Sequence, residues 1–301
     1  MNSEDRSSTP RDPQRSSGAL YVVATPIGNL ADIGRRALDV LAGADLILAE
    51  DTRHSAKLLS HYGISTACRS FHEHNEARQV AQVVKRIADG AHVALICDAG
   101  TPLVSDPGFR LVAALREQGL AVIPVPGPSA AICALSVAGL PTDRFCFEGF
   151  LPSRSSARRR VLHTLAREPR TLIFYESPRR LLSAVADMAV EFGDARRAVL
   201  ARELTKIHES VISGTLAELR DWLAAHAEQR RGECVIVVAG AARDSDDGLA
   251  GGVDPEALLR VLIEALPVKQ AVAVAARVTG IKRNVLYRQA LALAARGRED
   301  G

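Results

Sequence analysis

The chain is poor in aromatic residues and lacks the marks of several common protein classes. Phe, Tyr and Trp make up only 4% of its 301 residues, so its core has to be built mainly from Leu, Val, Ala and Ile. No apolar run approaches the roughly 20 residues that a membrane-spanning helix needs. The five cysteines form no CxxC motif and no close pair, which favours free thiols in a reducing cytoplasm over a disulfide framework.

Two nucleotide-binding motifs are also missing. The sequence has neither a GxGxxG fingerprint after its first strand nor a GxxxxGK[ST] loop, so it predicts neither a dinucleotide site nor a P-loop. Residues 1–17 are polar and lack an apolar signal core, and we expect a disordered tail there. The net charge of +3 is a mild excess of the sign that favours a polyanionic partner.

Strand patterns and helix patterns alternate along the chain, which is typical of an α/β protein with a mostly parallel sheet. With 47% hydrophobic and 24% charged residues, the composition is that of a soluble globular protein. We predict a tail at 1–17, α/β domains at 18–135 and 136–242, a linker at 243–253 and a helical module at 254–301. In that module Asp254-Pro255-Glu256 predicts a helix start, and the helices around Thr279-Gly280 resemble a helix-turn-helix.

The segment 93–108, VALICDAGTPLVSDPG, is the centre of the predicted architecture. An apolar strand ends at Asp98 in a loop of small residues, and Asp106-Pro107 predicts the N-cap and first residue of a new helix. Ligands of open α/β sheets bind where such strands end. The loop has no bulky side chain before Leu103, so a ligand could lie on its backbone, although a simple tight connection has the same pattern.

Other strands end in similar small or charged loops, with the sequences TPIGNL, EDTRH, PGPSAA, FYESPRR and ARELTK. If the strands run parallel, these loops share the carboxyl edge of the sheets and face one cleft. We expect that cleft to bind an adenosyl-type ligand, mainly through backbone groups.

These segments, in their order and spacing, resemble the bacterial 16S ribosomal RNA ribose 2'-O-methyltransferases of the tetrapyrrole-methylase superfamily. The resemblance runs from about Leu20 to Tyr287 and also includes FHEHNE and GLPTDRFCFEGFLP. It implies a class III methyltransferase fold of two α/β domains with S-adenosyl-L-methionine between them, usually in a homodimer. It also implies a cytoplasmic enzyme that methylates a cytidine ribose in the decoding region of 16S rRNA on the 30S subunit.

The resemblance assigns donor-binding residues one by one. In the superfamily an acid usually follows the glycine of the central loop, whereas here Thr101 stands in that place and Asp98 comes before it. Either residue is therefore a candidate for the amino or ribose end of the donor. The full predicted set is Pro26, Asp98, Gly100, Thr101, Val104, Ser105, Ser129, Ala130, Tyr175, Leu204 and Cys234.

A ribose hydroxyl is a poor nucleophile, so its methylation requires a base or a positive field near the developing alkoxide. EDTRH and FHEHNE supply such groups, including His72 and Glu76. From them we select Glu50, Asp51, Arg53, His54 and His74 as catalytic candidates. Alternatively, Glu50 and Asp51 cap the helix predicted at 52–60. The HEH pair has no third ligand at a suitable spacing, so no metal is predicted.

Basic residues gather in two places. Residues 154–180 contain eight arginines against two glutamates, and the C-terminal helices are basic as well. We predict RNA contacts by Arg158, Arg159, Arg160, Lys282 and Arg283, with a solvated helix face as the alternative. Glu203 and Lys206 are interpreted as a structural ion pair.

Two further functions stay open besides RNA methylation. A methylase of the same fold could act on a tetrapyrrole or another small molecule, but such a substrate does not need EDTRH, HEHN and the basic clusters together. A non-catalytic RNA-binding protein could keep a vestigial cleft, and a measurement of donor binding would separate it from both enzymes.

Overall fold

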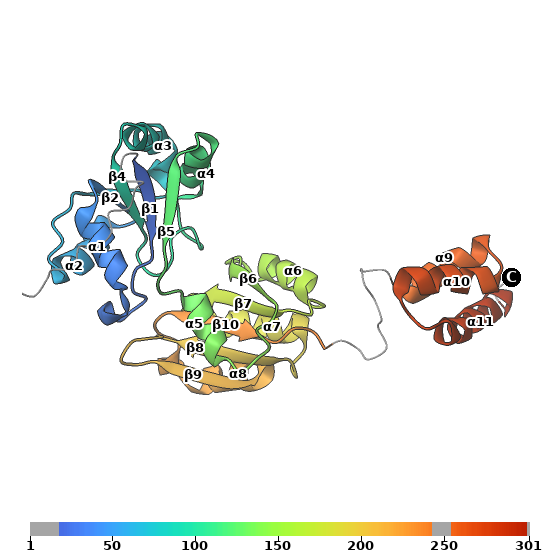
Figure 1. Cartoon of the computed structure of the whole chain (residues 1–301). Helices are drawn as coiled ribbons and strands as arrows, with labels where there is room; N and C mark the ends of the chain where they lie inside the picture. The colour runs from blue at the N-terminus through green and yellow to red at the C-terminus, as the bar shows by residue number, and fades with distance from the viewer. Residues whose placement is uncertain (1–17, 243–253, 300–301) are drawn as a thin grey trace, which may run out of the picture. The chain divides into compact units, whose positions relative to one another are not determined.

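The computed structural model describes residues 18–242 and 254–299, which fall into two compact units that divide after Ala241. The tail predicted at 1–17 and the linker predicted at 243–253 lie outside the described residues. The first unit contains two five-stranded sheets, and the second consists of helices (Figure 1).

The first sheet is parallel throughout, as the alternation of strands and helices predicts. Its order is β3-β2-β4-β1-β5. The strands are β1 (Ala19–Val23), β2 (Leu46–Ala49), β3 (Cys68–Ser70), β4 (His92–Ile96) and β5 (Ala121–Val125). The runs LILA in β2 and VALI in β4 are buried because helices cover both faces of the sheet.

The helices of this part pack in two pairs. One face is covered by α1 (Arg35–Gly43) and α2 (Thr52–His61), whose Leu41 and Leu58 belong to one core cluster. The other face is covered by α3 (Glu73–Ala88) and α4 (Phe109–Glu117), with Ile87 and Leu111 in a second cluster. A short 3-10 turn, η1 (Leu30–Asp32), follows β1. The carboxyl ends of the strands therefore stay free of helices.

The helix predicted at 109–117 is confirmed, but the N-cap predicted at Asp106 is wrong. The helix begins at Phe109, and its N-cap is Gly108 with φ 125° rather than Asp106. Its first free N–H groups, those of Arg110 and Leu111, donate to Oε1 of the buried Glu76 at 3.0 and 3.4 Å. A carboxylate at a helix N-terminus is also favoured by the helix dipole. Glu76 thus has a structural role, and Asp106 is free for another one.

The second sheet is mixed, which differs from the parallel arrangement expected. Its order is β6-β7-β10-β8-β9, and only β6 and β7 are parallel. The strands are β6 (Phe145–Phe150), β7 (Thr171–Glu176), β8 (Arg197–Arg202), β9 (Ser210–Thr215) and β10 (Cys234–Val238). Because β7 and β8 are both antiparallel to β10, their carboxyl ends lie at the edge where β10 begins. The loops after β6, β7 and β8 therefore still share one edge.

Helices cover both faces of the second sheet as well. The helices α6 (Ser155–Leu165), α7 (Leu181–Phe192) and α8 (Leu216–Ala225) pack on one face, and η2 (Ala227–Gln229) follows α8. The other face carries α5 (Ala130–Val137), whose Ala134 packs with Ile173 and Val237. Residues 126–129 therefore connect the two sheets, a few residues before the predicted domain limit at 135.

The second unit has a core of its own. Its helices α9 (Pro255–Ala265), α10 (Val268–Thr279) and α11 (Arg283–Glu299) meet around Leu259, Val272 and Leu286. Asp254 caps α9, and Gly280 ends α10 in the left-handed conformation (φ 73°), so the predicted helix start and turn are confirmed. No helix of the described part of the chain is both long enough and apolar enough to cross a membrane.

Candidate functional site

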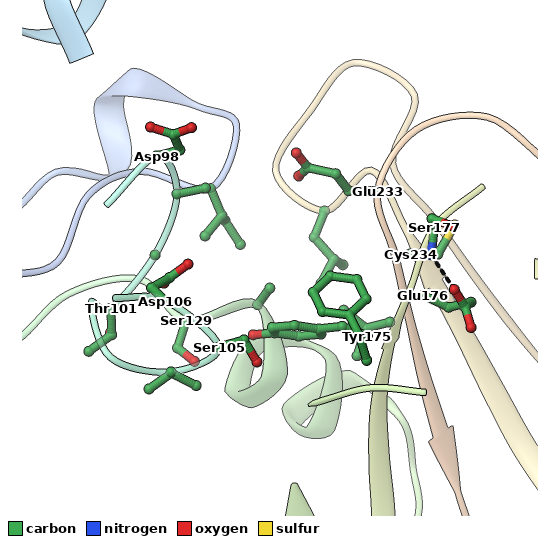
Figure 2. A pocket seen from close by; sticks show the side chains of 18 of the residues that line it. Asp98, Thr101, Ser105, Asp106, Ser129, Tyr175, Glu176, Ser177, Glu233 and Cys234 are labelled. Carbon is green, nitrogen blue, oxygen red and sulfur yellow. Dashed lines mark hydrogen bonds between the residues drawn. The ribbon is translucent and has the colours of Figure 1, made fainter. Parts of the chain in front are cut away.

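A cavity of about 400 Å³ lies among the strand ends of the first unit (Figure 2). The loops after β1, β2 and β4 line it, together with the start of α5, the ends of β6, β7 and β8 and the start of β10. Its volume falls within the range of about 300–1,000 Å³ that is typical of small-molecule sites. Both sheets contribute to this one cavity.

The loop after β4 is held in a fixed and strained shape. Thr25 and Gly100 exchange two backbone hydrogen bonds of 2.8 and 3.1 Å, and the Thr25 hydroxyl donates to the carbonyl of Cys97. Leu103 and Ser105 have φ of 72° and 70°, a conformation that costs free energy in residues with a side chain. Strain of this kind persists where the surroundings impose it, and it is common at ligand sites.

All but one of the predicted donor-binding residues line the cavity. The exception is Pro26, which is buried beside it, whereas the next residue, Ile27, is in the lining. Cys234 reaches the cavity because β10 is antiparallel and begins at the shared edge. The predicted residues in the lining are Asp98, Gly100, Thr101, Val104, Ser105, Ser129, Ala130, Tyr175, Leu204 and Cys234.

Tyr175 connects two of the elements that line the cavity, β7 and α5. Its hydroxyl accepts a hydrogen bond of 3.2 Å from the backbone N–H of Ala131, which ties β7 to the first turn of α5. Burial raises the pKa of the Tyr175 phenol, so it stays neutral at physiological pH. The rings of Phe147 and Phe150 contact it edge to face, with centroids 4.9 and 5.6 Å away.

Three carboxyl groups stand on the wall that the first sheet provides. They belong to Glu50, Asp98 and Asp106, and Figure 2 shows Asp98 and Asp106 across the cavity from Glu233. Burial and the charge of Asp98 raise the pKa of Glu50. Burial and the charges of Glu50 and Asp98 raise the pKa of Asp106 to about 6. A carboxylate with such a pKa can accept a proton near neutral pH.

Among the predicted catalytic residues, Glu50 lines the cavity and the others do not. Asp51 caps α2 by accepting the N–H of Arg53 at 2.8 Å, as the capping alternative expects. Its ion pair with Arg53 lowers the pKa of Asp51 to about 2, and the Arg53 side chain is 91% exposed. His54 and His74 are exposed on α2 and α3.

Asp106 was missed in the sequence because the Asp-Pro pair is a strong local signal for a helix start. In the folded chain the start of α4 is capped instead by Glu76, which lies 34 residues before Arg110 in the sequence. The half-buried His72 caps α3 in a reciprocal arrangement with Asn75. No group of three or more metal-ligating side chains occurs among the described residues.

The first arginine of the predicted RNA-binding set is buried. Arg158 pairs with Asp187 at 2.6 Å and donates to the carbonyls of Pro152 and Ser153, and its side chain is only 3% exposed. Its guanidinium is therefore occupied, and we remove it from the RNA-binding candidates. Arg159 is half-exposed and pairs with Glu191.

The remaining basic candidates are accessible. Arg160 is exposed on α6, and Lys282 and Arg283 are exposed where α11 begins.

One ion-pair cluster ties the loop after β8 to β10 beside the cavity. Lys206 lies between Glu203 and Glu233 at 2.9 and 3.1 Å, which confirms the structural ion pair. The neighbouring Thr205 accepts the N–H of Asn29 in the loop after β1 at 3.1 Å. These contacts connect loops from both sheets.

Comparison with known proteins shows the family of this chain. Residues 19–220 match the model of the tetrapyrrole (corrin/porphyrin) methylases, and residues 250–294 match that of the RsmI C-terminal HTH domain. The chain belongs to the tetrapyrrole methylase family. It is therefore a methyltransferase, and the family resemblance seen in the sequence is confirmed.

Its similar relatives share nearly the whole chain. A protein of Pseudomonas aeruginosa named ribosomal RNA small subunit methyltransferase I is 53% identical over 277 residues, which cover 92% of this chain and 98% of the relative. The protein of that name from Escherichia coli O157:H7 is 49% identical over 276 residues, which cover 92% and 96%.

Solved structures support the fold. Uroporphyrin-III-C-methyltransferase from Thermus thermophilus aligns with a TM-score of 0.53 at 22% identity, over 74% of this chain and 94% of that chain. A diphthine synthase aligns with a TM-score of 0.56 at 14% identity, over 74% and 90%. At these identities the likeness concerns the fold, and it confirms the predicted α/β methylase class.

Proposed function

We propose that this chain transfers a methyl group from S-adenosyl-L-methionine to the ribose 2'-hydroxyl of a cytidine in the decoding region of 16S rRNA. The proposed acceptor is the 30S subunit in the cytoplasm, and the proposed enzyme is a homodimer. One observation carries the proposal. The donor-binding residues carried over from the family gather around one cavity, in a chain about half identical to proteins named for ribosomal RNA methylation.

The cavity suits the proposed donor in size and in chemistry. Bound there, S-adenosylmethionine would supply a sulfonium methyl group open to in-line attack. The strained loop at 100–105 and the start of α5 would hold the donor through backbone groups, and Leu204 and Cys234 would contact its apolar parts. Because these elements are already fixed by mutual hydrogen bonds, they would align the donor without a large loss of entropy on binding.

The acceptor hydroxyl must lose its proton as it attacks. We propose Asp106 as the first candidate for the proton acceptor and Glu50 as the second, because both carboxyl groups line the cavity. The negative charge of the nearby Asp98 raises the pKa of Asp106 and so favours uptake of a proton. The exposed Arg53, His54 and His74 would contact the RNA near the cavity instead of taking part in proton transfer.

The acceptor would be held by basic side chains on two elements. Arg159 and Arg160 on α6, and Lys282 and Arg283 at the start of α11, are the accessible members of the predicted set. Contacts of this kind neutralise phosphates and give an affinity that falls with salt.

The experiment is methyl transfer from labelled S-adenosylmethionine to 16S RNA, offered both as naked RNA and as 30S particles from a strain that lacks this gene. We expect label on a ribose 2'-hydroxyl of a decoding-region cytidine, and faster transfer to the particles. Calorimetry with the donor runs in parallel. Donor binding without transfer to either RNA would reject the proposal in favour of a small-molecule acceptor. Absence of donor binding would reject both enzymes.

A further inference from the structure

We propose that Phe150 is the platform on which the base of the acceptor nucleotide stacks while its ribose is methylated. This inference rests on the proposed function and names a substrate-recognition residue within the same site. Phe150 ends β6, lines the cavity and is 56% exposed. A solvent-exposed aromatic ring in a cavity lining is notable in a chain with so few aromatic residues.

A β-bulge puts the ring there. Phe147 pairs with Ile173, Gly149 pairs with Phe174 and Phe150 pairs with Tyr175, so β6 contains one residue more than β7 in this stretch. Side chains alternate between the faces of a sheet, and regular pairing would turn Phe150 toward the face covered by α6 and α7. The extra residue reverses the alternation, and Phe150 joins Phe147 and Tyr175 on the cavity face. Bulges re-aim side chains in this way next to active sites.

The backbone around the bulge also brings the ring close to the reacting groups. Gly149 adopts φ 63°, and a Cβ atom at this position would lie 3.2 Å from Oγ of Ser105. The loop after β4, which includes Asp106, therefore packs directly against β6 at this point. A nucleotide whose ribose reaches Asp106 would have its base within reach of Phe150.

The chemistry of the ring fits a nucleobase. Sequence-specific recognition of RNA mostly targets unstacked bases, which stack on aromatic side chains. The edge-to-face contact with Tyr175 fixes the tilt of Phe150. Phe150 is 56% exposed, which leaves surface available for a base to stack on. The donor's adenine is the other planar group near this site, and the experiment below separates the two.

The test compares Phe150→Leu with Phe150→Tyr and Phe150→Trp, and uses Phe145→Leu as the matched control. Phe145 begins the same strand on the same face and is 40% exposed, but it is not part of the cavity lining. We expect Phe150→Leu to lower kcat/KM for 30S particles by about 5- to 150-fold, the range that corresponds to the stacking of one base on an aromatic residue. The donor Kd should stay within twofold, both aromatic variants should keep most of the activity, and Phe145→Leu should behave as wild type.

Phe150→Trp gives a second readout. The chain has a single native tryptophan, Trp222 on α8, so the fluorescence added by the new indole is obtained by difference from wild type. We expect acceptor particles to quench this added fluorescence, and S-adenosylhomocysteine alone to leave it unchanged.

Several outcomes would overturn the inference. If Phe150→Leu keeps the wild-type kcat/KM, the ring does not support the acceptor. If its donor Kd rises in step with the loss of activity, the ring belongs to the donor site. If the wild-type chain methylates no RNA, the proposed function fails first, and the inference fails with it.

Discussion

At the scale of single residues, the environment of Asp106 sets what its carboxyl group can do. The residue follows a strained loop and lies near Glu50 and Asp98, so its proton is held up to a pH of about 6. In the unfolded chain the same group titrates near 3.8. The folded protein therefore binds this proton more tightly, and the resulting stabilisation is complete below pH 4 and is lost as the pH rises through 6.

We expect Asp106→Asn to be more stable than wild type at pH 8, by on the order of 1 kcal/mol after allowance for the partial exposure of the group. A change of that size raises Tm by about 2–4 °C in a domain of 150–250 residues. The difference should disappear near pH 4, where wild-type Asp106 is protonated. Thermal unfolding at both pH values measures it, with the exposed Asp143→Asn as the control for the loss of one charge. Equal Tm values at pH 8 would contradict the raised pKa.

The same substitution should abolish most of the activity if Asp106 is the base. General base catalysis contributes about 10²–10⁴-fold, so we expect kcat to fall by that factor while the donor Kd changes little. In wild type, kcat/KM should rise with pH through about 6 as Asp106 of the free enzyme loses its proton. If Asp106→Asn keeps the activity, the matched Glu50→Gln variant decides whether Glu50 has the role.

At the scale of elements, neighbouring arginines of one helix differ in burial and in their partners. Arg158 of α6 points at α7 and forms an almost fully buried ion pair with Asp187, whereas Arg160 is exposed. Removing one partner of a buried pair leaves the other charge without compensation. The three consecutive arginines thus divide into one that supports the packing of α6 on α7 and two that remain accessible for RNA.

We expect Arg158→Ala to lower the free energy of unfolding by about 3–5 kcal/mol, and Arg160→Ala to change it by no more than about 0.5 kcal/mol. Urea unfolding measures both variants. Binding of 30S particles at low temperature should weaken for Arg160→Ala and stay at the wild-type level for folded Arg158→Ala. A stable Arg158→Ala variant with weakened RNA binding would restore Arg158 to the RNA-binding set.

At the scale of the whole molecule, the donor cavity and the basic start of α11 belong to separate compact units. We expect the double variant Lys282→Glu/Arg283→Glu to bind 30S particles more weakly. The slope of log K against log salt should fall by about 1–2, because up to two phosphate contacts are lost. The donor Kd should not change, since neither residue belongs to the cavity lining.

The matched control for this prediction is Lys85→Glu/Arg86→Glu. These residues form an exposed Lys-Arg pair in the last turn of α3, which leads into the amino end of β4, away from the cavity edge. Filter binding over a range of salt concentrations measures both double variants. Equal losses of affinity would mean that only the total charge matters, and that α11 has no specific role.

Features that depend on neighbours within one turn or one strand can be predicted from the amino-acid order alone. Alternating strands and helices, the continuous apolar runs of β2 and β4, the cap of α9 at Asp254 and the small-residue loop at 98–105 all have local causes. The donor set came from the family resemblance, and much of it lies on such loops. Local backbone preference and apolar periodicity depend on adjacent residues, so the amino-acid sequence is enough to predict them.

Contacts with a partner far along the chain become visible only in the folded structure. Glu76 caps α4 and so leaves Asp106 to the cavity, Asp187 buries Arg158, and β10 runs antiparallel so that Cys234 reaches the site. The bulge that aims Phe150 at the cavity is likewise defined only by its pairing with β7. When two contacting side chains lie about 30 residues apart in the sequence, their contact depends on how whole helices and strands pack. Many distant groups compete for each such contact. That choice is made only when the chain folds.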